Sequence, residues 1–195
     1  GRQHAAVADR HQFRQTAGVL SLQNRSRAGP LRWRDQFCMR RERHGFATLF
    51  LAEAYGMSSD QTIREHLVRA VELIVRTQND EGGWRYEPKR QDADISVTIC
   101  QIMALRAARN AGLFVPRETV DRCLDYVKRS QNPDGGFMYQ LSAPGDSRFP
   151  RSAAGVVALY SAGIYGGEEI DKGLEYLLKQ VPQSKAMQLE AHYFY

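Results

Sequence analysis

The amino-acid sequence predicts an all-α fold in which helices form an inner ring and an outer ring. From residue 44 onward, apolar helices rich in small residues alternate with amphipathic helices. Glycine-rich turns follow the amphipathic helices, and one turn sequence recurs after 53 residues, at Gln78 and again at Gln131. Each helix pair leaves an apolar face that only a neighbouring pair can cover, so the pairs must stack side by side.

The inner helices are expected at residues 45–56, 95–112 and 152–163. Their first three turns carry few charged residues, which predicts burial on most sides. Each segment ends near a glycine, the residue that most readily adopts the left-handed conformation after a helix. These glycines are Gly56, Gly112 and Gly163.

The outer helices are expected at residues 60–78, 116–131 and 167–180. Apolar residues recur at helical spacing on one face of each, and charged residues occupy the other. Ser59 or Asp60 is the predicted N-cap of the first of them, and Pro116 suits a first-turn position. About three helix pairs are visible, and residues 192–194 resemble the start of a fourth inner helix. Three pairs cannot close a ring, so we expect the chain to be part of a larger protein.

Residues 1–43 differ from the rest in charge. They hold ten arginines, no lysine and three acidic residues, a net charge of +7, whereas residues 44–195 carry −2. We interpret the first segment as a disordered or non-native lead-in, with an arginine-rich nucleic-acid-binding arm as the alternative. Residues 44–195 give no electrostatic reason to bind nucleic acid, so no such partner is expected. The chain has no apolar run long enough to span a membrane.

Two outer helices end in closely similar turns. Gln78, Gly82 and Trp84 have the same spacing as a second set, which consists of Gln131, Gly135 and Phe137. The glycines permit a tight reversal, and a glutamine at a helix end can bond to exposed backbone groups. The aromatic ring can shield that amide from water. A third copy near residue 180 lacks the Gly-Gly-aromatic ending.

This repeated turn resembles the QW motif of squalene–hopene and oxidosqualene cyclases and the related repeats of protein prenyltransferase β subunits. The resemblance covers residues 44–195 and implies a partial α/α toroid. It gives the glutamines, glycines and aromatics of both turns a structural role. It also implies a long isoprenoid or another apolar ligand as partner, with peripheral contact to a membrane.

Asp92 and Asp94 precede the second inner helix and are the candidate catalytic residues. From the residues alone, Asp94 is interpreted as a helix cap. The resemblance offers a sharper alternative, because squalene–hopene cyclases place an aspartate-rich stretch at this point. Asp94 would then match the residue that protonates an alkene, with Asp92 as its neighbour. Ile95 replaces the last aspartate of that stretch, which removes part of the network that stabilises a strong acid.

Protein prenyltransferases place a zinc-binding Asp-x-Cys at the corresponding helix start. Here Ser96 stands in place of the cysteine, and it cannot supply the thiolate that zinc prefers. Asp121 and Cys123 have the required spacing but fall within an outer helix. No metal and no cofactor is therefore expected.

Two functions follow from the resemblance. The first is isoprenoid binding or cyclisation in the parent protein, of the squalene–hopene type if the parent is an enzyme, with this piece alone inactive. The second is a non-catalytic scaffold or protein-binding module that keeps the repeats without the chemistry.

Overall fold

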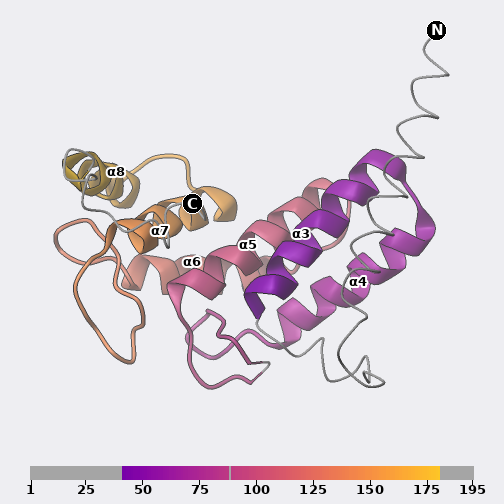
Figure 1. The fold of residues 1–195 in the computed structure, drawn as a ribbon, viewed down its shortest axis with the longest axis horizontal. Coiled ribbons are helices and arrows are strands. Elements are labelled where there is room, and N and C mark those ends of the chain that lie inside the picture. Colours follow the sequence, from indigo (N-terminus) through magenta and orange to yellow (C-terminus); the bar gives the residue numbers. More distant parts are fainter. Residues whose placement is uncertain (1–40, 88, 181–195) are drawn as a thin grey trace, which may run out of the picture. The chain divides into compact units, whose positions relative to one another are not determined.

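The computed structural model describes residues 41–87 and 89–180, which contain six α-helices and no β-strand. The helices are α3 (Arg41–Ser58), α4 (Gln61–Arg76), α5 (Ile95–Asn110), α6 (Arg117–Arg129), α7 (Phe149–Ala162) and α8 (Glu168–Gln180) (Figure 1). Expectations about residues 1–40 and 192–194 lie outside the described residues. Within the described part, no helix is long and apolar enough to cross a membrane.

Helix α5 is the central inner helix of this array. It packs against α3 on one side and α7 on the other, and it also contacts α4 and α6 (Figure 1). Most of its side chains are buried, including Ile99, Ile102 and Leu105. A helix that is buried almost all round needs apolar residues on every face, which explains its nearly uncharged sequence.

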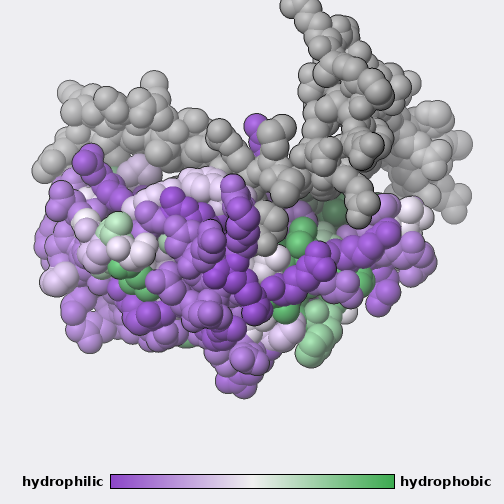
Figure 2. Space-filling view, turned by 90° about the horizontal axis from the view of Figure 1, so that it is seen from below, coloured by the Kyte–Doolittle hydropathy of each residue, from purple (hydrophilic) through white to green (hydrophobic). Residues whose placement is uncertain are grey.

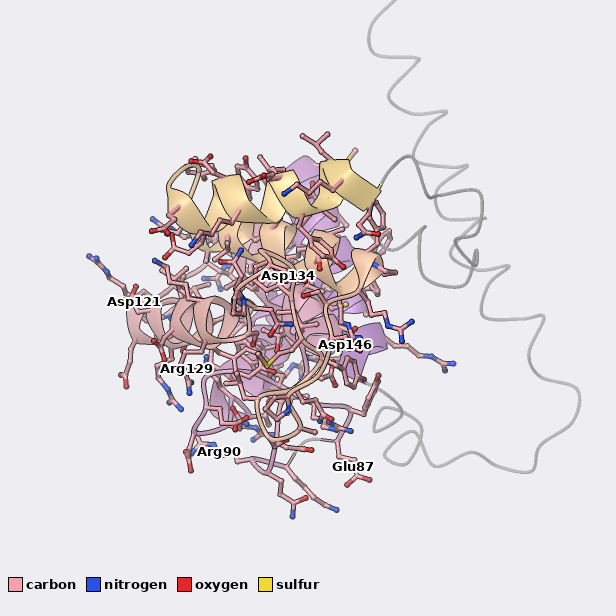
Figure 3. All side chains as sticks on the ribbon, turned by 90° about the vertical axis from the view of Figure 1, so that its left-hand side faces the viewer. Glu87, Arg90, Asp121, Arg129, Asp134 and Asp146 are labelled. Atoms are coloured by element: carbon pink, nitrogen blue, oxygen red, sulfur yellow. The ribbon has the colours of Figure 1, made fainter. Side chains whose placement is uncertain are left out.

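The outer helices bury one face each. Helix α4 packs on α3 and α5, α6 on α5 and α7, and α8 on α7. In α6 the buried face includes Cys123, Tyr126 and Val127. Charged side chains such as Asp121 and Arg129 extend from the rest of this helix (Figure 3). The predicted all-α fold with inner and outer helices is thereby confirmed.

The helix ends follow the expected signals at most positions. The Asp60 carboxylate caps α4 by accepting a hydrogen bond from the backbone N–H of Thr62 at 2.7 Å. Gly112 and Gly163 adopt positive φ angles of 88° and 102° after α5 and α7.

The main differences from the expected boundaries are in α3 and α7. Helix α3 begins at Arg41, four residues before the expected start at Gly45. Helix α3 continues past Gly56 to Ser58, and Ser59 rather than the glycine takes the positive φ, at 54°. Helix α7 begins at Phe149, three residues before the expected start at Ser152. Pro150 lies in its first turn, where the fixed φ of proline suits a helix and its missing N–H is not needed.

Candidate functional site

The first Gln-Gly-aromatic turn ties α4 to the next outer helix. The side-chain amide nitrogen of Gln78 donates to the carbonyl of Gly82 at 2.7 Å, within the turn. It also donates to the carbonyl of Thr119 at 2.9 Å, in the first turn of α6. Gln78 is buried, so both of its N–H donors are satisfied away from water.

The second turn repeats both contacts one helix pair further along the chain. The Gln131 amide nitrogen donates to the carbonyl of Gly135 and to that of Glu169, each at 2.9 Å. Glu169 lies in the first turn of α8, as Thr119 lies in the first turn of α6. The two glutamines therefore join α4 to α6 and α6 to α8 in the same way.

The glycines of these turns are required by close backbone approach as well as by conformation. Gly82 has a φ of 98°, and a Cβ there would lie 2.1 Å from the carbonyl oxygen of Arg122. Gly135 has a φ of 88°, and its Cβ would lie 2.3 Å from the carbonyl oxygen of Lys172. Any side chain at either position would push the turn away from the next outer helix.

The aromatic residues connect the turns to the helices around them. The Trp84 indole N–H donates to the carbonyl of Ile74 at 2.8 Å, in the last turn of α4. The backbone N–H of Trp84 donates to Thr98 Oγ1 at 3.2 Å, and that of Phe137 donates to Ser152 Oγ at 2.9 Å. The two hydroxyls belong to α5 and α7, so each turn is also tied to an inner helix.

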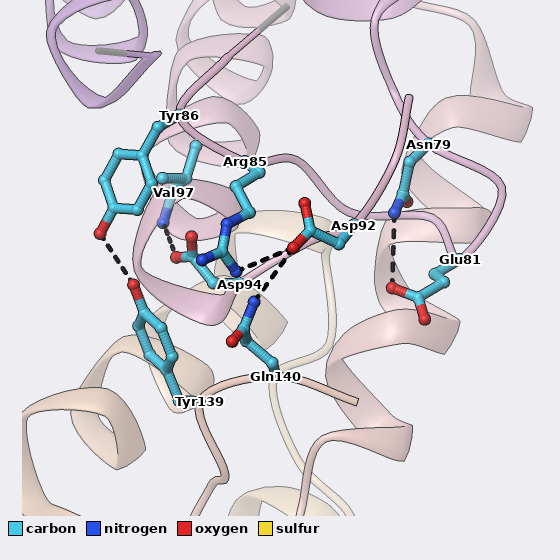
Figure 4. A network of polar contacts seen from close by, with 9 residues as sticks. All are labelled: Asn79, Glu81, Arg85, Tyr86, Asp92, Asp94, Val97, Tyr139 and Gln140. Atoms are coloured by element: carbon cyan, nitrogen blue, oxygen red, sulfur yellow. Dashed lines mark hydrogen bonds and ion pairs between the residues drawn. The ribbon is translucent and has the colours of Figure 1, made fainter. Parts of the chain in front are cut away.

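Asp94 is fully buried and is the N-cap of α5. Its Oδ1 accepts a hydrogen bond from the backbone N–H of Val97 at 2.8 Å (Figure 4). Its own backbone N–H donates to the carbonyl of Trp84 at 3.0 Å. This geometry matches the capping interpretation of Asp94.

Asp92 makes contacts of a different kind. Its Oδ2 lies 3.2 Å from an Arg85 guanidinium nitrogen and accepts a hydrogen bond of 3.4 Å from the Gln140 amide (Figure 4). Gln140 follows the second turn, so Asp92 links the loops after the two Gln-Gly-aromatic turns. Its side chain is 42% exposed, in contrast to buried Asp94.

A pair of tyrosines lies beside these carboxylates, and sequence reasoning missed it. The hydroxyls of Tyr86 and Tyr139 are 2.8 Å apart (Figure 4). Each tyrosine comes two residues after the aromatic of its turn, and this shared register is the signal that could have identified them. Arg85 lies over the Tyr86 ring, 5.8 Å from its centroid, and Arg151 lies over the Tyr139 ring at 5.9 Å.

Tyr126 of α6 is buried and is a further group that the sequence did not single out. Its ring packs against the backbone at Gly83, where an added Cβ would lie 3.2 Å from the ring. Burial and the neighbouring Asp94 carboxylate raise the pKa of the Tyr126 phenol, so it stays neutral. Asp94 thus has a buried neutral phenol in its surroundings.

The residues with metal-ligand chemistry are dispersed. Among the described residues, no three His, Cys, Asp or Glu side chains come together as a metal site. Cys123 is buried in α6, and burial raises the pKa of its thiol. Asp121 forms an ion pair with Arg117 at 3.4 Å. His44 lies within α3 and donates from Nε2 to the carbonyl of Ala70 in α4 at 3.1 Å.

Seen from the side on which the two turns lie, the described surface is mostly hydrophilic, with small hydrophobic areas (Figure 2). The polar contacts of Asp92, Gln140 and the tyrosine pair belong to loops rather than to the inner side of the helices. This end of the array can therefore position charged and hydroxyl groups over the beginning of α5.

Comparison with known families agrees with this architecture. The family model described as the prenyltransferase alpha-alpha toroid domain matches residues 35–188, well over half of the chain. No curated protein matches the chain significantly. The matched range contains all six described helices and both Gln-Gly-aromatic turns. The chain belongs to the prenyltransferase α/α-toroid domain family.

Proposed function

We propose that the inner side of this helix array binds a long isoprenoid chain. Helix α5 contacts α3, α7, α4 and α6, and only a few of its side chains are not buried. The half-buried residues of α5 are Ser96, Met103 and Arg106, and Ser96 and Met103 lie seven residues apart and so on one face. These two residues mark the inner side of α5.

Helix α7 presents a similar face. Ala153 and Val157 are half-buried and lie four residues apart, so they also share one side of the helix. We infer that these two residues and Ser96 and Met103 face the same side of the array, and we call these four uncharged residues the inner strip. This uncharged strip is the observation that carries the proposal, because an isoprenoid chain offers only apolar surface for recognition.

Equilibrium dialysis with radiolabelled farnesol, a short isoprenoid alcohol, tests this proposal. We expect saturable binding to the wild-type chain and at least about tenfold weaker binding to Met103→Lys, which places a charge on the inner strip. Met57→Lys is the matched control, because Met57 is 88% exposed near the end of α3 and lies outside the strip. The control should bind farnesol within about twofold of the wild type.

Thermal unfolding of both variants checks that each is folded, and Met103→Gln provides a milder replacement if the lysine disrupts packing. Equal binding by all variants, or no saturable binding by the wild-type chain, would contradict the proposal. The second result would favour a scaffold that joins helix pairs without holding a ligand.

Cyclisation is a second candidate function, with Asp94 as the acid and Asp92 as its neighbour. Two observations favour it: Asp94 is fully buried at the start of an inner helix, and a buried phenol lies near it. A buried carboxyl that keeps its proton can act as a general acid. The cap contact of Asp94 and the loss of the last aspartate at Ile95 weigh against it.

Turnover of squalene by the full-length parent separates these roles. Asp94→Asn keeps a side-chain oxygen that can cap α5 but removes the acid. If Asp94 is the acid, cyclic products should disappear in Asp94→Asn while the melting temperature stays close to that of the wild type. Unchanged product formation by this variant would assign Asp94 to capping alone.

A further inference from the structure

A pocket of about 440 Å³ lies where the end of α5 meets the beginning of α6 and the end of α7. Ile102 and Leu105 of α5, which are buried, form its floor together with Val120 of α6, which is half-buried. Arg109 and Tyr165 are exposed and stand at its rim. The volume of this pocket falls within the range of small-molecule sites.

Arg106 is held in place at the side of this pocket. Its guanidinium donates to the carbonyl of Tyr160, near the end of α7. It also lies over the Tyr165 ring, 5.5 Å from the centroid. These contacts fix the position of the guanidinium and use only part of its five N–H donors.

The charge of the pocket is not neutralised by the described residues. No acidic side chain lines it, and neither Arg106 nor Arg109 forms an ion pair with an acidic residue of the described part. The arginines on the outer face of α6 behave differently, since Arg117 pairs with Asp121 and Arg129 with Asp125. Arg106 and Arg109, which have no carboxylate partner among the described residues, therefore line a pocket whose floor is apolar.

This combination suits a ligand with an acidic head and an aliphatic body. A guanidinium can hold a carboxylate or phosphate through two parallel hydrogen bonds. The half-buried Val115, Val120 and Ala162 leave apolar surface that an alkyl chain can cover. The ends of α5 and α7 carry partial negative charge, which the two arginines offset for an anionic ligand. We propose that this pocket binds an anionic amphiphile, with its head group at Arg106 and Arg109.

Isothermal titration of the full chain with decanoate, decyl phosphate and decanol tests this proposal. The two anions distinguish a carboxylate from a phosphate head group, and decanol measures the contribution of the alkyl chain alone. We expect saturable binding of at least one anion, about tenfold or more tighter than binding of decanol. Farnesol, which like decanol has no acidic head group, should displace the anion no better than decanol does.

Two variants complete the test. Arg109→Gln should weaken binding of the anion by about tenfold or more, and because Arg109 is exposed its replacement leaves the packing intact. Arg64→Gln removes the same charge from the exposed face of α4 and should change binding by less than about twofold. The proposal is overturned if both variants lose affinity equally, if decanol binds as tightly as the anions, or if neither anion binds saturably.

Discussion

A Cβ at Gly82 would lie 2.1 Å from the backbone oxygen of Arg122, so substitution of Gly82 should destabilise the fold. Gly82→Ala should lower the free energy of unfolding by roughly 2–5 kcal/mol, because it combines an unfavourable positive φ with a clash. Gly112→Ala is the matched control, since Gly112 has a φ of 88° but nothing within 4 Å of its Cβ position. It should cost only about 1–2 kcal/mol. Urea unfolding measures both losses, and equal values would refute the role of the close approach.

The cap at Asp94 allows a second residue-level prediction. Asp94→Ala removes the oxygen that accepts from Val97 N–H and should lower the free energy of unfolding by about 1–2 kcal/mol. Asparagine is also a good N-cap, so Asp94→Asn should cost much less, about 0.5 kcal/mol. Chemical denaturation distinguishes the two. A loss as large for asparagine as for alanine would mean that the charge, rather than the cap, stabilises this position.

At the scale of elements, the glutamine amides should control how firmly neighbouring outer helices are joined. Gln78→Glu replaces a donor of two buried hydrogen bonds with an acceptor that faces two carbonyls. We expect a loss of roughly 2–4 kcal/mol in the free energy of unfolding. Gln61→Glu is the control, because Gln61 is exposed in the first turn of α4, where a negative charge is favourable. If both variants are equally stable, the amide contacts do not join the helices.

The contact between α6 and α8 should depend on pH. Lys128 Nζ lies 2.6 Å from Glu169 Oε1, and its hydrogen bond lowers the pKa of this carboxyl below the usual 4.5. The pair therefore stabilises the protein fully above pH 4.5, and the contribution is lost as the pH falls through the lower folded-state pKa. Both side chains are about one-third exposed, so the contribution is about 0.2–1 kcal/mol.

Urea unfolding at pH 7 and at pH 3 checks this expectation for the wild type and for Glu169→Gln. The variant should be less stable than the wild type at pH 7, and the difference should shrink at pH 3. Glu72→Gln, on the exposed face of α4, serves as the control. A difference that stays constant with pH would exclude the ion pair as its source.

The helices themselves could be predicted because their signals are local. Apolar spacing and capping residues identified all six, and of the two candidate caps of α4, Ser59 and Asp60, the structure uses Asp60. Two boundary errors came from misread signals. Gly56 was taken as the end of α3 but lies inside its last turn, and Pro150 was not recognised as a first-turn residue of α7, which begins at Phe149. The partners of Gln78 and Gln131 could not be predicted, because the accepting carbonyls lie in the next helix pair and depend on packing.

At the scale of the whole molecule, repetition made the fold predictable and left the site undetermined. The two turns use the same contacts on both helix pairs, so the Gln and Gly positions already indicated an array. Asp94 has no such partner in the next pair, where the N-cap of α7 is Arg148 and makes no side-chain cap. Because an aspartate cap occurs at only one of these two inner helices, the second helix pair gives no evidence on the role of Asp94, and its role must be tested chemically.

The central functional claim is that an isoprenoid chain lies along the inner strip. The most direct test is an NMR titration of the chain, labelled with ¹³C at the methionine methyl groups, with farnesol. We predict a shift of the Met103 methyl signal and cross-peaks between it and the farnesol methyl groups, while the signal of exposed Met57 stays unchanged. A Met103 signal that does not move at saturating farnesol, or a response confined to Met57, would contradict the claim.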